Sequence, residues 1–311
     1  MDSIESFRNR LQKNLKRRRK RFHRDGIYCF RVYDRDIPAF PLTIDVYEDA
    51  LLFSIYEGKH GVASLPFDEL MDVSRVQLGI EKDRVFQKTR RRRVAGQQHE
   101  KLNATNERFS VRESNLQFWV NLRDYTDTGL FLDHRNTRAQ VRTEALGKRV
   151  LNLFSYTGSF SVYALAGGAD QVTSVDVSGP YLRWAEDNIR LNQLRLEKAR
   201  FIRHDVKEYL EETWRNNERF DLIIIDPPTA SKSKRAVSDF DIQRDYVALL
   251  SMANRLLTPG GCIFFSTNFQ QFQFDEASID GVRVTDMTHQ SVPEDFRRSP
   301  PPHRCWRLQQ T

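Results

Sequence analysis

The sequence lacks the features that mark membrane-spanning and disulfide-stapled proteins. No apolar run approaches the roughly 20 residues that a membrane-spanning helix needs, and the basic N-terminus lacks the apolar core of a secretory signal. Cysteine is scarce, because the 311 residues include only Cys29, Cys262 and Cys305, whose separation fits neither a metal site nor a disulfide framework. These absences, with 39% hydrophobic residues, predict a folded cytoplasmic protein without a metal centre.

Acidic residues are missing from one stretch of the chain. Residues 8–24 hold ten Lys and Arg and no Asp or Glu, in a chain of net charge +7, and a second basic cluster lies at residues 82–93. Such clusters are typical of solvated helix faces and also of surfaces that attract phosphates. Two separate clusters favour a nucleic-acid partner. The cations expected to contact it are Lys16, Arg17, Arg18, Arg19, Arg90, Arg91, Arg92 and Arg93.

The N-terminal part of the chain predicts a helix followed by a small mixed domain. Phe7, Leu11 and Leu15 recur at helical spacing among the cations, so residues 1–25 are expected to form a basic helix. Residues 26–125 contain short runs rich in β-branched and aromatic residues, bounded by Pro, Asp and Gly, with one amphipathic helical run. They predict a small α+β domain with a nucleic-acid-binding or accessory role.

Residues 126–311 have a different rhythm. From about residue 148 onward, apolar runs such as "RVLNLFS", "QVTSVDV" and "FDLIIIDPP" alternate with helical runs. Strict alternation of strands with helices predicts an α/β fold with a parallel sheet that is covered on both faces. Ligands in such sheets bind at the carboxyl ends of the strands.

Three aspartates fall at those carboxyl ends. Asp176, Asp205 and Asp226 each end or follow a predicted strand, so all three are expected at one edge of the sheet. The first turn, "FSYTGSFS", contains Gly158 but not the G-x-G-x-x-G of a dinucleotide pyrophosphate site, which counts against a nicotinamide oxidoreductase. A ligand with a nucleoside and no pyrophosphate fits better, and S-adenosylmethionine is such a ligand.

Each aspartate has an expected role. Asp176 is placed to accept hydrogen bonds from the ribose hydroxyls, Asp205 is placed to accept from the adenine amino group, and Asp226 is expected beside the transferred methyl. Asp176 and Asp205 also precede helices, so the alternative that they are N-caps stays open. Asp226 is followed by Pro227 and Pro228, which weakens the cap alternative. A carboxylate at the end of an apolar strand is costly unless it is used, so we expect a rigid functional group.

Four longer stretches carry a family resemblance, namely "NLFSYTGSFSVYA", "SVDVSGPYLRWAEDNIRLN", "FDLIIIDPPTASKSKR" and "FDIQRDYVALLSMANRLLTPGG". They resemble the class I S-adenosylmethionine-dependent RNA methyltransferases, in particular the C-terminal half of the bifunctional 23S rRNA guanine methyltransferases, which forms 7-methylguanine. The likeness extends to "WVNLRDYTDTGLFLDHR", "RLQKNLKRRRKRFHRDGIYCFRVYD" and "HRCWRL", and so covers nearly the whole chain. The family's N2-guanine methyltransferase half has no counterpart in this sequence. A separate N2-guanine methyltransferase is therefore one expected protein partner.

The resemblance implies a fold, a cofactor and a substrate. It implies a seven-stranded Rossmann-like sheet with an antiparallel last strand, S-adenosylmethionine as cofactor, and 23S ribosomal RNA, naked or in a precursor particle, as substrate. It also places "GLFLDHR" over the methionine end of the cofactor, with Asp133 toward the amino group and Arg135 toward the carboxylate or in a structural ion pair.

The motifs and the resemblance together give three sets of site residues. The expected cofactor set is Asp133, Arg135, Phe154, Tyr156, Thr157, Gly158, Asp176, Val177, Asp205, Val206 and Asp226. The expected catalytic turn is Asp226, Pro227 and Pro228. The residues that follow this turn and are expected to contact RNA are Thr229, Lys232, Lys234 and Arg235.

The chemistry of guanine N7 suits this set. N7 has a lone pair and no proton, so methyl transfer needs no general base and no metal, only orientation and stabilisation of the developing positive charge. Asp226 and the Pro227 carbonyl can supply both. Two alternatives stay open: methylation of an exocyclic amine (guanine N2 or adenine N6), and a catalytically silent RNA-binding assembly factor. Cytosine C5 chemistry is disfavoured, because Thr267 stands where that chemistry needs a cysteine and Cys262 lies at the start of the strand.

Overall fold

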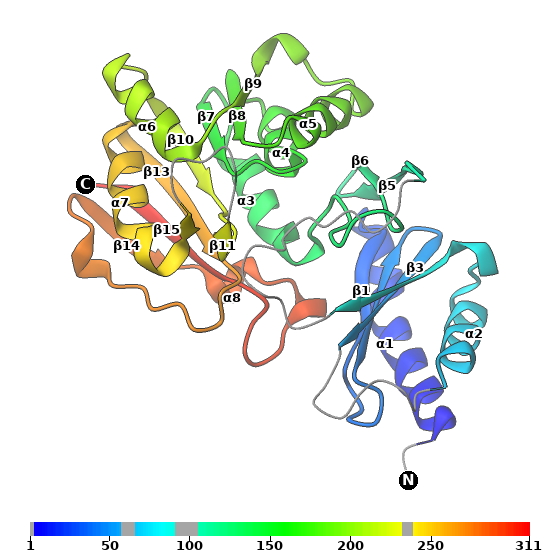
Figure 1. The fold of residues 1–311 in the computed structure, drawn as a ribbon. Coiled ribbons are helices and arrows are strands. Elements are labelled where there is room, and N and C mark those ends of the chain that lie inside the picture. Colours follow the sequence, from blue (N-terminus) through cyan, green and yellow to red (C-terminus); the bar gives the residue numbers. More distant parts are fainter. Residues whose placement is uncertain (1–2, 57–65, 91–104, 232–238) are drawn as a thin grey trace. The chain divides into compact units, whose positions relative to one another are not determined.

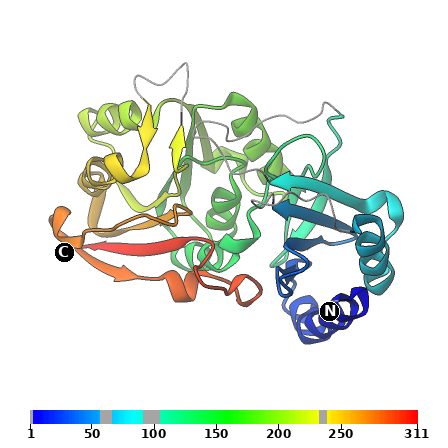
Figure 2. The ribbon, with the colours of Figure 1, turned by 60° about the horizontal axis from the view of Figure 1, so that its bottom comes forward.

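The computed structural model describes residues 3–56, 66–90, 105–231 and 239–311. The chain separates into two compact units, which Figures 1 and 2 show. Unit 1 consists of the described residues up to Thr128, and unit 2 consists of the described residues from Gly129 to Thr311.

Unit 1 is built on a four-stranded sheet in the order β1-β2-β3-β4, in which β4 is parallel to β3 and the other pairs are antiparallel. Its strands are β1 (Cys29–Asp34), β2 (Leu42–Tyr47), β3 (Ala50–Tyr56) and β4 (Val85–Arg90). The remaining elements are the helices α1 (Ile4–Arg24) and α2 (Phe67–Leu78), the 3-10 turn η1 (Lys82–Arg84), and the hairpin of β5 (Phe109–Glu113) and β6 (Leu116–Val120).

Helix α1 forms where the helical spacing predicted it. Its N-cap Ser3 accepts a hydrogen bond from the Ser6 N–H. Phe7 and Leu11 are fully buried in one hydrophobic cluster with residues of the sheet and of α2. Burial of each such side chain contributes roughly 1.5–3 kcal/mol, so the apolar stripe of α1 holds it against the sheet while most of its cations lie on the solvent side.

Unit 2 contains a seven-stranded sheet in the order β14-β15-β13-β10-β7-β8-β9. The last strand, β15, runs antiparallel to both of its neighbours, and the other adjacent pairs are parallel. This confirms the predicted α/β fold, a Rossmann-like sheet with an antiparallel last strand. The strands are β7 (Arg149–Leu153), β8 (Gln171–Asp176), β9 (Ala199–Arg203), β10 (Phe220–Ile225), β13 (Leu257–Thr267), β14 (Val282–Asp286) and β15 (Arg304–Gln310).

Helices lie on both faces of this sheet. The helices α3, α4 and α5 contact one another in sequence, whereas α6 contacts α7 (Figure 1). Because both faces are covered, Leu222, Ile223, Ile224 and Ile225 of β10 are all at most 1% exposed, which explains the continuous apolar run. The main helices are α3 (Arg135–Glu144), α4 (Ser159–Ala166), α5 (Gly179–Leu191), α6 (Val206–Arg215) and α7 (Ile242–Arg255).

Short elements complete unit 2. They are α8 (Thr288–Ser291), the 3-10 turns η2 (Leu132–His134), η3 (Leu196–Lys198), η4 (Glu276–Ser278) and η5 (Glu294–Phe296), and the paired strands β11 (Ala230–Ser231) and β12 (Phe240–Asp241). No helix in the described part of the chain is both long and apolar enough to cross a bilayer.

Candidate active site

The three strand-end aspartates of unit 2 come from neighbouring parallel strands. Asp176 is the last residue of β8, Asp205 lies two residues beyond β9, and Asp226 directly follows β10. The strands β8, β9 and β10 lie with β7 in one part of the sheet, in the order β10-β7-β8-β9. Their carboxyl ends therefore meet at one edge of the sheet, the place where ligands of such folds bind.

The turn after β7 is held in an uncommon backbone conformation at this edge. Phe154 and Tyr156 have φ angles of +54° and +50°, a region that residues other than glycine seldom occupy. Such a conformation costs on the order of 1 kcal/mol or more per residue and persists only where surrounding contacts fix it. Here the Tyr156 hydroxyl accepts from the Gly129 N–H at 3.0 Å, and the Thr157 hydroxyl donates to the Gly129 carbonyl at 2.6 Å. The turn is thus preorganised in a single shape.

Asp176 supports the same turn without capping the next helix. Its Oδ2 accepts from the Tyr156 N–H at 2.9 Å, and its Oδ1 accepts from the Ser178 N–H at 2.8 Å. The N-cap of α5 is Ser178, whose side chain accepts from the Tyr181 N–H. The cap alternative is therefore wrong for Asp176. Asp176 itself is partly exposed at this edge of the sheet.

Gly158 is required for the packing of a neighbouring helix. Its φ of +72° suits glycine, and a Cβ added there would lie 2.5 Å from the Cβ of Ala185 on α5. The side-chain amide of Asn188, also on α5, donates to the Thr157 carbonyl at 2.9 Å. Gly158 therefore lets α5 pack directly on the turn.

Asp205 has the structural role that the cap alternative gave it. It is the N-cap of α6 and its Oδ1 accepts from the Lys207 and Glu208 N–H groups. Its remaining oxygen leaves room for a ligand contact as well. Val206 is 3% exposed and belongs to the hydrophobic core, so its side chain faces away from a solvent-accessible site. Val177 is partly exposed, and its carbonyl accepts from Arg203 Nε at 3.3 Å.

Asp226 is oriented by two side chains that the sequence patterns did not indicate. Its Oδ1 accepts from the Ser266 hydroxyl at 2.6 Å, and its Oδ2 lies 3.6 Å from His134 Nε2. Ser266 is 2% exposed and lies on β13. The register of β13 with β10 pairs Phe265 with Ile225, so the residues that follow them, Ser266 and Asp226, lie side by side. Ser266 is thus identified by the register of the sheet, which the sequence patterns do not give.

His134 is buried in an environment that disfavours its protonated form. Burial is the main cause that lowers the pKa of His134 below its usual 6.5, and the Asp226 carboxylate opposes that shift only partly. Its ring stacks on that of His303, with ring centres 4.0 Å apart and planes 14° apart. His303 Nδ1 lies 3.0 Å from Asp133 Oδ2, and His303 Nε2 lies 3.0 Å from the Ser291 hydroxyl. These contacts anchor the segment that carries Asp133.

This cluster is poorly arranged for a metal ion. Asp133, His134 and His303 place ligand atoms within 4.8 Å of one another. The lone pairs of an imidazole lie in its ring plane, however, and face-to-face rings cannot aim them at one point between the planes. Both nitrogens of His303 also have other contacts.

Arg135 forms a structural ion pair, which was one of the two roles that the sequence left open for it. Its guanidinium Nη2 pairs with Asp295 Oδ1 at 2.5 Å, and both residues are only 3% exposed. Removing one partner of such a buried pair is strongly destabilising, so Arg135 fixes the segment that begins α3.

Comparison with known proteins identifies the family. A family model described as S-adenosylmethionine-dependent methyltransferase matches residues 79–289. The chain belongs to this family. Its cofactor is S-adenosylmethionine.

Individual relatives of this methyltransferase are similar over nearly its whole length. Ribosomal RNA large subunit methyltransferase K of Neisseria meningitidis serogroup B is 43% identical, over 99% of this chain and 88% of the relative. Ribosomal RNA large subunit methyltransferase K/L of Syntrophotalea carbinolica is also 43% identical, over 97% of this chain but 42% of the relative, so the chain spans less than half of the K/L relatives. The crystal structure of SMU.776 complexed with SAH has a TM-score of 0.79 and 25% identity, covering 99% of this chain and 82% of that one.

The expected RNA-contacting residues of α1 divide into two groups. Lys16, Arg17 and Arg19 are exposed. Arg18 is partly buried, and its Nη1 donates to the Arg31 carbonyl of β1 at 2.8 Å, so it attaches α1 to the sheet. This corrects the expectation that all four cations are available to RNA.

The remaining expected RNA contacts fall partly outside the described residues. In the Asp-Pro-Pro turn, Pro227 is buried and Pro228 is partly exposed. Thr229, which follows the turn, is partly buried, and its hydroxyl donates to Asn268 Oδ1 at 2.9 Å. The side chain of Arg90 and the whole of Arg91, Arg92, Arg93, Lys232, Lys234 and Arg235 lie outside the part of the chain that the structure describes.

The cysteines of the methyltransferase unit are buried thiols. Burial raises the pKa of Cys262 to about 11. Cys262 lies on β13 opposite Leu222 of β10, five residues before Thr267, which ends β13 at the ligand edge. Cys305 lies opposite Ser266 but is 0% exposed, and burial raises its pKa strongly. Neither thiol has the exposure and low pKa of a nucleophilic cysteine.

Proposed function

We propose that this methyltransferase modifies RNA of the large ribosomal subunit at guanine N7. The observation that carries the proposal is the similarity to ribosomal RNA large subunit methyltransferase K, which covers 99% of the chain and includes the Asp226-Pro227-Pro228 turn. The basic face of α1 fits a phosphate-rich substrate. The buried, high-pKa cysteines argue against cytosine C5 chemistry, which needs a reactive thiol.

The site residues divide the work of an in-line displacement. S-adenosylmethionine supplies a methyl group on a positively charged sulfur. The guanine N7 lone pair forms the new bond to the methyl carbon while the carbon–sulfur bond breaks, so positive charge moves from sulfur to the base. In the proposed arrangement Asp176 holds the ribose diol, Asp205 accepts from the adenine amino group, and Asp226 accepts from N–H groups of the guanine. The negative charge of Asp226 then favours the developing cation.

Methylation of an exocyclic amine is the second candidate. The Pro227 carbonyl and the Asp226 carboxylate would both be acceptors for an amino group, and Pro228 contributes no competing N–H. The two candidates differ in product, because 7-methylguanine is labile to alkali whereas N2-methylguanine and N6-methyladenine are stable.

Asp226→Asn tests the proposal, because it keeps the shape of the side chain and removes the charge. We expect turnover to fall by a factor on the order of 10²–10³, with little change in S-adenosylmethionine affinity. Nucleoside mass spectrometry of large-subunit RNA after reaction with the wild-type enzyme should show 7-methylguanine, and the rate should not depend on a group that titrates near neutrality.

Asp221→Asn is the matched control for that variant. Asp221 lies near the amino end of the same strand, where its carboxylate accepts from the Arg149 N–H and the Thr258 hydroxyl. Its substitution should lower stability and leave turnover of the folded enzyme nearly unchanged. An alkali-stable methylated base as product would reject N7 chemistry, and equal turnover of Asp226→Asn and wild type would reject the role of Asp226.

A further inference from the structure

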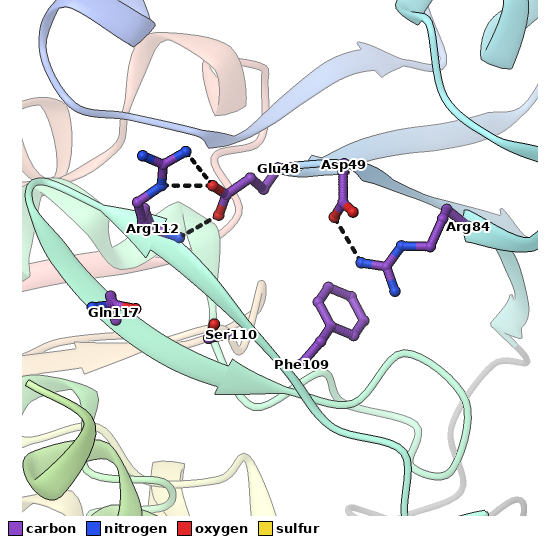
Figure 3. A pocket seen from close by; sticks show the side chains of 7 residues that line it. All are labelled: Glu48, Asp49, Arg84, Phe109, Ser110, Arg112 and Gln117. Atoms are coloured by element: carbon purple, nitrogen blue, oxygen red, sulfur yellow. Dashed lines mark hydrogen bonds and ion pairs between the residues drawn. The ribbon is translucent and has the colours of Figure 1, made fainter.

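Unit 1 has an open hollow of about 430 Å³ on the side of its β5–β6 hairpin (Figure 3). Three separate segments line it. The β2–β3 turn supplies Glu48 and Asp49, η1 supplies Arg84, and the β5–β6 hairpin supplies Phe109, Ser110, Arg112 and Gln117. Segments distant in sequence thus converge on one concave surface that the site in unit 2 does not use.

The wall of the hollow contains a stacked arginine and aromatic pair. The Arg84 guanidinium carbon lies 4.0 Å from the centre of the Phe109 ring. Arg84 is held in place by an ion pair from Nη2 to Asp49 Oδ1 at 2.6 Å, and its side chain is 26% exposed. A guanidinium fixed in this way presents a flat surface on which another planar group can stack.

A second arginine repeats the arrangement beside the first. Arg112 lies 4.0 Å above the ring of Tyr28, and its Nε donates to Glu48 Oε1 at 2.5 Å. Its backbone N–H donates to the other Glu48 oxygen at 3.0 Å. Both guanidinium planes are therefore positioned before any ligand arrives.

The charges of the hollow indicate the kind of ligand. Among the described lining residues two arginines face two carboxylates, so these residues carry no net charge that would select a phosphate. Its surface offers a flat stacking face together with hydrogen-bonding groups, including the Asp49 carboxylate, which is 69% exposed and uses one oxygen for Arg84. Unpaired nucleobases are recognised by this combination of stacking on aromatic or guanidinium planes and hydrogen bonds to their edges.

We propose that this hollow binds one unpaired nucleobase of the RNA substrate. The base extends the stack of Phe109 and Arg84, and its amino or imino N–H groups donate to Asp49. The inference rests on the proposed function for the claim that RNA is the substrate, and it adds a base-specific contact in unit 1 to the phosphate contacts expected from α1.

The test uses the full chain and two fluorescent oligonucleotides of the same length and charge. One is a single-stranded RNA, and the other is the same ribose-phosphate chain without bases. Arg84→Lys keeps the charge and removes the plane, and Phe109→Leu keeps apolar volume and removes the ring. Both should weaken binding of the base-containing strand roughly 5-fold or more and leave binding of the abasic strand unchanged. The salt dependence of binding should also stay the same, because no charge is lost.

Arg75→Lys is the matched control. Arg75 is also in unit 1, pairs through Nε with Asp72 at 2.6 Å, and is 29% exposed, which closely matches the ion pair of Arg84. It lies on α2, outside the hollow. Its substitution should affect neither oligonucleotide. Thermal unfolding of each variant identifies any loss that comes from misfolding, and Arg84→Lys alters no core residue.

Three results would overturn the proposal. Unchanged affinity of Arg84→Lys and Phe109→Leu for the base-containing strand would show that the hollow takes no base. Equal weakening of both strands would show a phosphate contact instead. An effect of Arg75→Lys as large as that of Arg84→Lys would show a general loss of structure. Formation of 7-methylguanine by the wild-type enzyme is measured separately, so failure of this proposal and failure of the proposed function are distinguishable.

Discussion

Removal of the Ser266 hydroxyl isolates one contact of the proposed catalytic carboxylate. In Ser266→Ala, Asp226 Oδ1 loses a hydrogen bond of 2.6 Å at a position that is 2% exposed. A buried hydrogen bond to a charged group is worth about 1.5–3 kcal/mol. If Asp226 must be fixed to orient the base in the transition state, that energy appears as a loss of turnover of roughly 10- to 150-fold. S-adenosylmethionine affinity should change little, because the turn that Asp176 supports is left intact.

Single-turnover methyl transfer with radiolabelled cofactor measures the loss, and calorimetry measures cofactor affinity. Ser266→Thr retains the hydroxyl and should recover most of the rate. Ser174→Ala is the control, because Ser174 is also a buried strand serine, with a neutral hydrogen bond of 2.8 Å to Ser161. It should cost on the order of 1 kcal/mol in stability and no turnover. Wild-type turnover in Ser266→Ala, or an equal loss in Ser174→Ala, would refute the positioning role.

Three further outcomes follow from the same geometry. Asp176→Asn removes the charge that would hold the ribose diol, and calorimetry should show S-adenosylmethionine binding weakened roughly 10-fold or more, whereas an unchanged affinity would contradict that assignment. His134 has a lowered folded-state pKa, so below pH 6.5 the unfolded chain gains a proton that the folded chain does not, and folding stability falls with falling pH by up to about 1.4 kcal/mol per unit. Urea unfolding of His134→Gln should therefore lose less stability between pH 7.5 and 5.5 than wild type, and an identical loss would show that His134 does not titrate this way. Replacing Lys16, Arg17 and Arg19 with Gln should lower RNA affinity and reduce its salt slope by up to about 2, without affecting cofactor binding. An unchanged salt slope would identify the face as merely solvated.

The sheet and its ligand edge were predictable because their signals are local. The central strands β7 and β10 contain short buried apolar runs, and Asp176, Asp205 and Asp226 each end a parallel strand or follow one within two residues. Parallel connections then force those ends to one edge whatever the details of packing. The basic helix α1 was predictable for a similar reason, since Phe7 and Leu11 mark its buried stripe within four residues of each other.

Helix α3 escaped prediction because its buried face is polar. Thr137 and Arg138 are at most 1% exposed, and Val141 is the only aliphatic residue that α3 buries completely. Arg138 is accommodated by a hydrogen bond from its Nη1 to the Phe131 carbonyl at 2.8 Å. Burial of this kind leaves no apolar periodicity in the sequence, so a pattern of hydrophobic spacing cannot detect it.

Side-chain partners were the other class of feature beyond sequence reasoning. Ser266 and His134 are 40 and 92 positions from Asp226 in the chain, and only the register of β13 with β10 and the stacking of His134 on His303 bring them to it. The reason for Gly158 was likewise hidden, because its missing side chain makes room for Ala185 of a later helix.

The neutrality of the groups around Asp226 bears directly on the proposed chemistry. The two side chains that contact it among the described residues are Ser266, which has no charge, and His134, whose pKa burial lowers. The nearby Cys305 is a neutral thiol, because burial raises its pKa. Neither of these two described side chains brings a positive charge that cancels the carboxylate, so in the proposed mechanism its field can act on the base. In that mechanism positive charge develops on the base only as the methyl is transferred, so the field would stabilise the transition state more than the bound substrate. Protonation of His134 would oppose this effect, and the burial of His134 disfavours that protonation.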